Sequence, residues 1–254
     1  MRVLPVVDLL NGVAVHGIAG RRSTYRPVQS RLVSGAEPLT LVQAFRDQLH
    51  LSICYLADLD AILHGHPNLR LFERLRSAGF GLMVDAGVRQ LADARDILKA
   101  GANLVIVGLE TSPGPDSLQE IVDELGPEQV VFSLDLQGGK PLTRSGSGWE
   151  SLGAPEIVSR VVALGIQSVI LLDLAAVGMG QGIPTEELCV SLRREFPNLR
   201  LITGGGVRNV EDLNREVRRG VAAVLVASAL HDGRLSAADL LPFSRGWPSA
   251  EAAK

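Results

Sequence analysis

Residues 199–230, LRLITGGGVRNVEDLNREVRRGVAAVLVASAL, carry the pattern that decides the fold. The apolar run LRLITGGG (199–206) predicts a buried strand, VEDLNREVRRG (210–220) predicts an amphipathic helix that stops at Gly220, and AAVLVAS (222–228) predicts a second strand. A strand, a helix and another strand in this order are typical of a parallel sheet. The rest of the chain should therefore show the same alternation.

Eight apolar runs of this kind alternate with amphipathic stretches along the chain. Most of the runs are rich in Val, Ile and Leu without polar alternation, as expected of parallel strands buried on both faces. Eight such units without a break in composition predict an α/β protein, a single (β/α)8 TIM barrel over residues 1–254; an open doubly wound sheet is the alternative. The other six runs are VLPVVDLL (3–10), LSICYLADL (51–59), GLMVDAG (81–87), NLVIVG (103–108), QVVFSLDL (129–136) and QSVILLDL (167–174).

The chain also repeats itself at a spacing of about half its length. Gly101 and Gly220 align at a shift of 119 residues, and the same shift brings GVR at 87–89 onto GVR at 206–208. VVDLLNG in the first run resembles SLDLQGG in the fifth, with Asp8 on Asp135. Such self-similarity indicates an internal duplication. We expect two similar half-barrels, about 1–125 and 126–254.

Composition excludes several classes of protein. The 254 residues are 46% hydrophobic with a net charge of −3, which leaves no general field for nucleic acid, and no run reaches the length of a membrane span. The start, MRVLPVVDLLNG, is charged at Arg2 and Asp8 and predicts a first strand in a cytoplasmic protein rather than a secretion signal. Cys54 and Cys189, the only cysteines, are expected to be buried thiols. We expect no cofactor and no metal, and the sequence points to no particular protein partner.

Two aspartates end opposite strands of the expected barrel. Asp8 follows the first strand and Asp135 follows the fifth, so their carboxylates should face each other across the mouth where such barrels carry their active sites. An opposed pair can divide acid and base roles if the surroundings separate the two pKa values. The alternative is that each aspartate caps the turn that follows its strand.

Glycine-rich turns predict where an anion binds. Backbone N–H groups of Gly205 and Gly206 after strand seven, with Ala227 and Ser228 after strand eight, match the phosphate site of many barrels. The corresponding first-half positions are Gly87 and Gly108. Here Asp85 places a negative charge beside the expected phosphate, so we expect weaker binding unless an arginine offsets that charge.

Three further features remain open between a functional and a structural role. The loop 11–37 after the first strand carries Arg21, Arg22, Tyr25 and Arg26 and is either a lid or an ordinary solvated loop. Trp149, in the Gly-rich segment GGKPLTRSGSGW, either stacks on a planar ligand or belongs to the core. Asp173, after strand six, either touches substrate or orients a loop. His64 and His66 are weak candidates for metal ligands.

These motifs resemble the histidine-biosynthesis family that contains a ribotide isomerase and the cyclase subunit of imidazole glycerol phosphate synthase. The resemblance covers VVDLLNG, ADLDAI, SLDLQGGK, ITGGGVRNVEDL and VASALHDGRL, and thus nearly the whole chain. It implies a substrate with a phosphate at each end and metal-free acid/base chemistry that converts an aminoaldose into an aminoketose. Asp8 would then remove the sugar C2 proton, Asp135 would assist ring opening, and Trp149 would stack on the substrate.

The chain also departs from that family. Leu172, Val177 and Met179 replace polar positions after strand six, and HGIAGR at 16–21 replaces the usual Arg-Leu-x-Gln-Gly-Asp. The arginine-rich loop looks like a divergent branch, similar to isomerase-like proteins of methanogens and C1-metabolising bacteria. We therefore expect a divergent isomerase acting on a phosphorylated sugar or ribotide, including a reaction in a pterin-linked C1 pathway. The alternatives are the orthodox ribotide isomerase and a non-catalytic phosphosugar-binding or partner protein.

Overall fold

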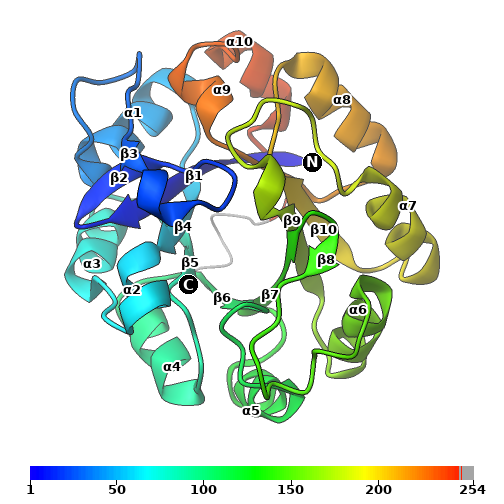
Figure 1. Cartoon of the computed structure of the whole chain (residues 1–254). Coiled ribbons are helices and arrows are strands. Elements are labelled where there is room, and N and C mark those ends of the chain that lie inside the picture. The colour runs from blue at the N-terminus through cyan, green and yellow to red at the C-terminus, as the bar shows by residue number, and fades with distance from the viewer. Residues whose placement is uncertain (246, 248–254) are drawn as a thin grey trace.

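A computed structural model describes residues 1–245 and 247, and in this part of the chain eight parallel strands close into a barrel (Figure 1). Closure comes from the pairing of the first strand with the last, Arg2 opposite Ala223. The (β/α)8 prediction is confirmed, and all eight predicted runs form barrel strands. These are β1 (Arg2–Leu10), β4 (Ile53–Asp58), β5 (Gly81–Asp85), β6 (Leu104–Gly108), β7 (Val130–Gln137), β9 (Ser168–Asp173), β10 (Arg200–Gly204) and β11 (Ala223–Val226).

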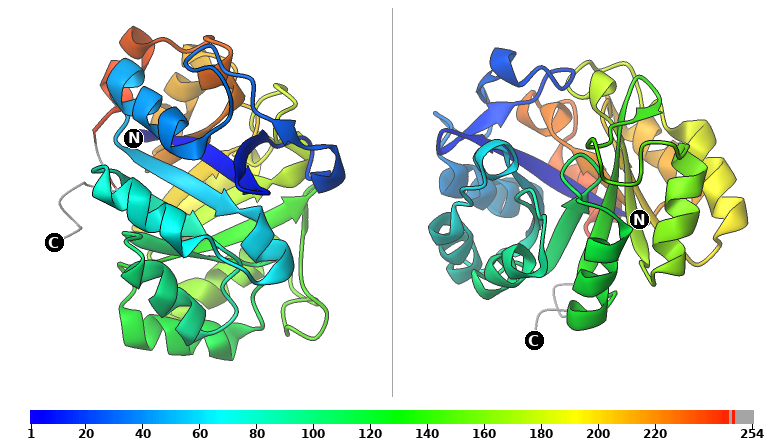
Figure 2. Two further views of the ribbon diagram at one scale, coloured as in Figure 1. Left: turned by 90° about the vertical axis from the view of Figure 1, so that its left-hand side faces the viewer. Right: turned by 60° about the horizontal axis from the view of Figure 1, so that its bottom comes forward.

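Helices surround the barrel on its outside (Figures 1 and 2). They follow the strands in the predicted alternation, and several end at a left-handed glycine such as Gly220 (φ +73°). The helices are α1 (Pro38–Leu49), α2 (Leu59–His64), α3 (Leu69–Ser77), α4 (Leu91–Lys99), α5 (Pro115–Leu125), α6 (Ala154–Ala163), α7 (Glu186–Glu195), α8 (Val210–Arg219), α9 (Ser228–His231) and α10 (Ala237–Leu240), with 3-10 turns η1 (Arg22–Thr24), η2 (Leu174–Ala176) and η3 (Leu241–Phe243).

Each barrel strand contributes to two cores, because successive side chains point to opposite faces. On β1, Leu4 and Val6 pack inside the barrel, while Val3 and Val7 pack against the helices. Burial on both faces explains the continuous apolar runs. The same alternation directs Asp8, two residues after Val6, toward the interior.

The loop 11–37 has more structure than the sequence suggested. It contains an antiparallel hairpin of β2 (Val13–His16) and β3 (Arg26–Pro27), which continues the sheet beyond β1 and carries η1 at its tip. A smaller hairpin joins β8 (Lys140–Pro141) to β7. Both hairpins lie at the mouth of the barrel (Figure 1).

Two further predictions can be compared with the structure. Cys54 and Cys189 are both buried free thiols, as predicted. None of the helices in residues 1–245 has the length and apolar character needed to span a bilayer. The duplication into half-barrels remains a prediction, and the last residues of the predicted domain, 246 and 248–254, lie outside the described residues.

Candidate active site

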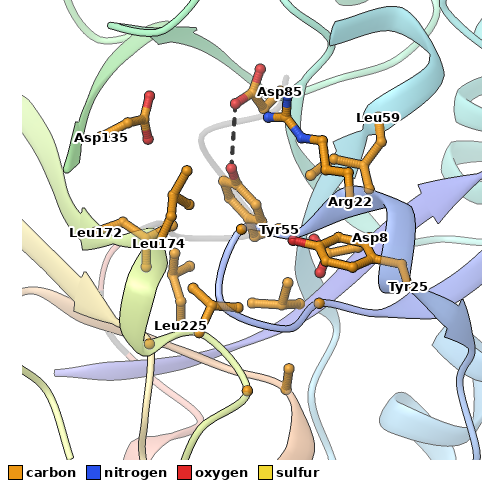
Figure 3. A pocket seen from close by; sticks show the side chains of 18 of the residues that line it. Asp8, Arg22, Tyr25, Tyr55, Leu59, Asp85, Asp135, Leu172, Leu174 and Leu225 are labelled. Carbon is orange, nitrogen blue, oxygen red and sulfur yellow. Dashed lines mark hydrogen bonds between the residues drawn. The ribbon is translucent and has the colours of Figure 1, made fainter. Parts of the chain in front are cut away.

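A cavity opens at the carboxyl-terminal ends of the barrel strands and receives side chains from both halves of the chain (Figure 3). It is the place where a barrel of this kind carries its chemistry. The hairpin after β1 contributes one wall and the loop after β9 another. Of the residues singled out in the sequence, those that line it are Asp8, Arg22, Tyr25, Asp85, Gly108, Asp135, Leu172, Val177, Gly205, Gly206, Ala227 and Ser228.

Asp8 presents a carboxylate that accepts no hydrogen bond from the described residues and faces the cavity. The backbone of Gly17 passes so close that a Cβ there would lie 2.8 Å from Asp8 Oδ2, so a larger residue would displace the carboxylate. Burial raises the pKa of Asp8 to about 7; the charge of Arg22 opposes this shift, and that of Asp85 adds to it. A carboxylate with a pKa near neutrality is suited to proton transfer.

Asp135 lies across the cavity from Asp8, with Tyr55 and Asp85 between them (Figure 3). It is 7% exposed, and its Oδ1 accepts a 2.7 Å hydrogen bond from Ser133 Oγ. Burial raises its pKa to about 8, and the negative charge of Asp85 adds to the shift. Burial thus raises the pKa of both carboxyl groups toward neutrality, so that one can act as an acid and the other as a base.

The first-half wall carries further carboxylates. Asp85 lies at the end of β5, 8% exposed, and accepts hydrogen bonds from Tyr55 Oη at 3.4 Å and from Gly87 N at 3.1 Å. Its pKa is raised to about 6, chiefly by burial. Glu110 lies beyond the end of β6 and lines the same wall. We call this wall, made of Asp85, Gly108, Glu110 and Asp135, the carboxylate end.

One cation from the hairpin reaches the carboxylate end. Arg22 in η1 forms two contacts with the carboxylate of Glu110, at 2.6 and 2.8 Å. Tyr25 also lines the cavity, and burial raises its pKa to about 12, with a further contribution from Asp8. Arg21 and Arg26 are exposed and lie outside the lining, so only part of the predicted lid set faces the cavity.

A second contact, a backbone hydrogen bond, holds the hairpin over the mouth of the barrel. Ala19 N donates a 2.8 Å hydrogen bond to the carbonyl of Val177 in the loop after β9. Gly178 follows, with φ +72°, and a Cβ there would lie 2.2 Å from Gly17 O. The hairpin is thus bonded to the second half through Ala19 and to the first half through Arg22.

The opposite wall is formed by backbone rather than by charged side chains. We call Gly205, Gly206, Ala227 and Ser228 the glycine end. Gly206 has φ +126°, and a Cβ there would lie 2.1 Å from Gly182 O, so the turn requires glycine. Within the described residues, Gly206 N and Val207 N donate no hydrogen bond. These N–H groups are available to an anion.

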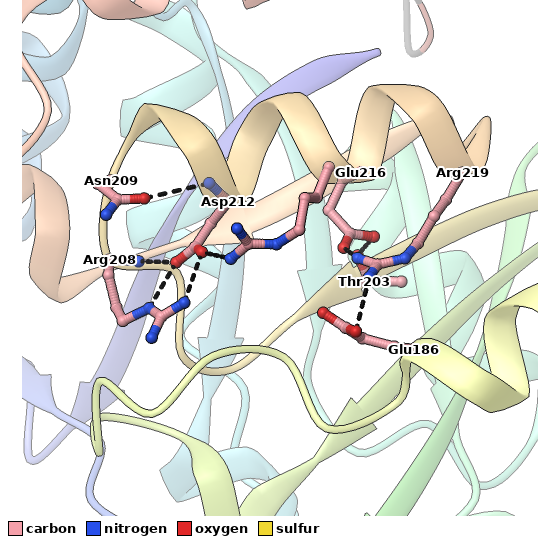
Figure 4. A network of polar contacts seen from close by, with 8 residues as sticks. Glu186, Thr203, Arg208, Asn209, Asp212, Glu216 and Arg219 are labelled. Atoms are coloured by element: carbon pink, nitrogen blue, oxygen red, sulfur yellow. Dashed lines mark hydrogen bonds and ion pairs between the residues drawn. The ribbon is translucent and has the colours of Figure 1, made fainter.

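Polar contacts along α8 anchor this turn (Figure 4). Asp212 is 3% exposed; its carboxylate accepts hydrogen bonds from Arg208 and pairs with Arg215, and its backbone N–H donates to Asn209 Oδ1. One turn later, Glu216 accepts from Thr203 Oγ1 of β10 at 3.2 Å. The helix is thereby fixed to the strand that precedes the turn.

The first-half turn has lost the corresponding features. Gly87 does not line the cavity, and its N–H is occupied by Asp85 Oδ1. Arg89 points elsewhere and donates to the carbonyls of Gly87 and Ile62, at 2.9 and 2.8 Å. The negative charge of Asp85 is therefore not offset by Arg89, and the nearby Arg22 is paired with Glu110.

Two residues considered for ligand contact lie outside the cavity lining. Trp149 is fully buried, with its ring 5.9 Å from that of Phe132 and its Nε1 3.4 Å from Ser112 Oγ. Asp173 accepts hydrogen bonds from the N–H groups of Gly138 and Gly139, at 3.0 and 2.7 Å. In this structure Trp149 occupies a core position and Asp173 orients the hairpin after β7.

The rim after β9 is apolar, as the sequence suggested, but not every one of its apolar residues faces the cavity. Leu172, Leu174 and Val177 line the cavity. Met179 is 43% exposed and lies outside the lining, which corrects the expectation that it faces the site. A substrate hydroxyl near this rim would find no hydrogen-bond partner in these side chains.

Sequence reasoning overlooked three titratable residues of the lining. Tyr55 lies inside an apolar run, but its parity on β4 directs it inward; Glu110 lies two residues after the end of β6; and His16 ends β2. Strand parity could have identified Tyr55. No pattern in the sequence indicated the hairpin that brings His16 to the cavity. In residues 1–245 and 247, no three His, Cys, Asp or Glu side chains are grouped as metal ligands.

Two kinds of comparison with known proteins, one with a family model and one with individual sequences, agree with each other. A model of the family described as histidine biosynthesis protein matches residues 2–236. Isomerases of a bis-phosphoribosyl imidazole-4-carboxamide from Syntrophomonas wolfei and Deinococcus radiodurans are each 29% identical, over 95% and 92% of this chain and 97% and 95% of their own length. An uncharacterized protein of Methanocaldococcus jannaschii is 30% identical over 95% of this chain and 98% of its own.

Proposed function

This chain belongs to the histidine biosynthesis protein family, and on that premise we propose that it is an isomerase that moves protons within a phosphorylated sugar or ribotide. The observation that carries the proposal is the opposed pair Asp8 and Asp135, whose pKa values are raised to about 7 and about 8 in one cavity. The pair supplies a base and an acid at neutral pH, as an aldose-to-ketose rearrangement requires.

In the proposed reaction, Asp135 donates a proton to the ring oxygen of the sugar as the ring opens. Asp8 then removes the proton from C2 to give an enaminol, and protonation at C1 with loss of the proton from the C2 hydroxyl completes the conversion of an aminoaldose into an aminoketose. Tyr55 and Asp85, which are joined by a hydrogen bond, lie between the two carboxylates (Figure 3). The apolar rim of Leu172 and Val177 limits access of water.

The substrate phosphate would bind at the glycine end. Gly205, Gly206, Ala227 and Ser228 line that end, and its free backbone N–H groups suit an anion. At the first-half positions Gly87 and Gly108 the glycine N–H is engaged and Asp85 repels negative charge. We therefore expect anion binding at the glycine end and much weaker binding at the carboxylate end.

The asymmetry of the two ends favours a substrate other than the bis-phosphoribosyl compound for which the relatives are named. The orthodox isomerase needs two phosphates held, whereas this cavity offers donors to one. A non-catalytic phosphosugar-binding protein is the remaining alternative, and the raised pKa values of Asp8 and Asp135 speak against it. A cytoplasmic location and the lack of nucleic-acid partners stay predictions from the sequence.

Proton exchange with solvent tests the reaction class directly. Aminoaldose phosphates and the orthodox ribotide are incubated with the protein in D2O, and loss of the C2–H signal, with entry of deuterium at C1 of the ketose product, is followed by NMR. Wild type should exchange this proton, and Asp8→Asn and Asp135→Asn should each slow exchange by at least ~10²-fold while circular dichroism shows an intact fold. If both variants keep near-native rates, the carboxylates are structural and the proposal is wrong.

A further inference from the structure

His16 carries a nitrogen that no protein group satisfies. It ends β2, and its imidazole lines the cavity. Its Nε2 atom is buried and, within the described residues, has no hydrogen-bond partner. Buried polar atoms in folded proteins are nearly always paired, so an unpaired one needs an explanation. A ligand that meets Nε2 in the working protein would supply it.

The surroundings of His16 place it at the glycine end. Its Nε2 lies 3.3 Å from the position that a Cβ of Gly178 would occupy, in the loop after β9. A small side chamber of the site is lined by His16 together with Asp8, Ala227 and Ser228. The nitrogen is therefore next to the strand-eight residues and away from Asp85.

Other donors line the main cavity next to this chamber, and Ser228 borders both spaces. The backbone N–H of Gly206 and the hydroxyl of Ser228 have no partner in the described residues. His231 also borders the chamber, but its Nδ1 lies 3.2 Å from Ser30 Oγ. Of these two histidines, His16 is the one whose buried nitrogen has no partner among the described residues.

We propose that His16 is a ligand of the substrate phosphate and donates a hydrogen bond from Nε2 to a phosphate oxygen at the glycine end. The ligand class is a phosphate monoester, because its oxygens accept several hydrogen bonds and the donors here converge from an imidazole, a hydroxyl and the backbone. The inference rests on the phosphate site of the proposed function and does not depend on the reaction. Asp8 shares the chamber, so phosphate binding at His16 places the sugar beside the catalytic base.

Inorganic phosphate is the probe, titrated into protein labelled with ¹⁵N-histidine. We expect the His16 Nε2 resonance to shift with the binding curve measured by calorimetry. His16→Ala should weaken phosphate binding about tenfold, the scale of one charge-assisted hydrogen bond. His16→Gln, which keeps an N–H donor, should retain part of the affinity. His66→Ala on the exposed surface is the matched control and should bind like wild type.

Three results would overturn the proposal: wild type binds no phosphate, His16→Ala binds as tightly as wild type, or the His16 resonance stays unchanged at saturation. Thermal melts of both variants separate lost binding from lost folding, and His16→Gln keeps the test valid if the alanine variant is unstable. Phosphate binding that depends on His16, without C2 proton exchange on any substrate, would reject the proposed reaction and leave this inference standing.

Discussion

The two ends of the cavity come from turns at corresponding positions of the chain, and they have opposite chemistry. After β10, Gly206 leaves its N–H open and no carboxylate competes for it. After β5, the corresponding Gly87 donates its N–H to Asp85 Oδ1, and Asp85 projects into the cavity. Glycine is present in both turns. The difference shows that a glycine turn binds an anion only when its donors are free.

The largest expected effect of this difference is on the substrate of the named relatives. With the bis-phosphoribosyl ribotide, repulsion at Asp85 and unpaired hydroxyls against Leu172 and Val177 should reduce kcat/KM by ~10²–10⁴, at ~1–3 kcal/mol for each unpaired group. A steady-state assay with that ribotide measures it. A kcat/KM within the ~10⁴–10⁸ M⁻¹s⁻¹ of ordinary enzymes would show that both ends still hold phosphate.

A second prediction concerns the charge buried at the carboxylate end. The pKa of Asp135 is raised to about 8 in the folded protein, whereas an unfolded aspartate titrates near ~4. The folded state therefore binds this proton more tightly, and the associated stability is present below about pH 4 and lost as the pH rises to about 8. Asp135→Asn should lose less stability than wild type as the pH rises. Near pH 9 its free energy of unfolding should exceed that of wild type by at least about 1 kcal/mol.

Urea unfolding at several pH values checks it, with the exposed Asp96→Asn as the matched control. Asp96→Asn should follow the wild-type pH profile. If the free energy of unfolding depends on pH in the same way for wild type and Asp135→Asn, burial does not raise the pKa of Asp135.

A third prediction concerns variants that make the carboxylate end more like the glycine end. Asp85→Gly removes the charge and frees Gly87 N, so a second phosphate should bind, with about tenfold higher affinity than the first-half end of wild type. Asp85→Asn removes the charge but keeps an oxygen that accepts from Gly87 N, so its gain should be smaller. Calorimetric stoichiometry distinguishes them. If neither variant gains a site, the competing carboxylate is not what blocks the turn.

The smallest effect is expected at the ion pair over the carboxylate end. Arg22 and Glu110 have side chains 25% and 23% exposed, so Arg22→Ala should lower the free energy of unfolding by no more than ~1 kcal/mol. Its local effect should be clearer, because amide hydrogens of the hairpin should exchange faster. Arg26→Ala, outside the cavity, is the control. Unchanged exchange in Arg22→Ala would show that the pair with Glu110 is not needed to hold the hairpin in place.

The fold was predictable because its signal is repeated. Each barrel strand is buried on both faces, so each appears as an apolar run, and eight runs with intervening helices fit few architectures. The hairpin after β1 was missed because β3 has two residues, Arg26 and Pro27, and its pairing depends on contacts that local sequence does not encode.

The candidate site was partly predictable. Strand parity explains which of the predicted residues line the cavity and which do not. Asp8 and Asp135 share the inward parity of their strands, whereas Asp173 has the outward parity and binds the 138–139 turn. The sequence analysis left the role of Asp173 open, and the parity of its strand favours the loop-orienting alternative. The unpaired nitrogen of His16 could not be anticipated, because it depends on how the hairpin folds over the mouth.

The pairing of β1 with β11 has a consequence for biosynthesis. Arg2 pairs with Ala223, so a ribosome must add more than 200 residues before the first strand can meet its last neighbour. Until then both strands are open edges, able to pair with other chains. Closing so long a loop is entropically costly, so the barrel should close late, and the nascent chain should depend on its early helices to shield the waiting edge.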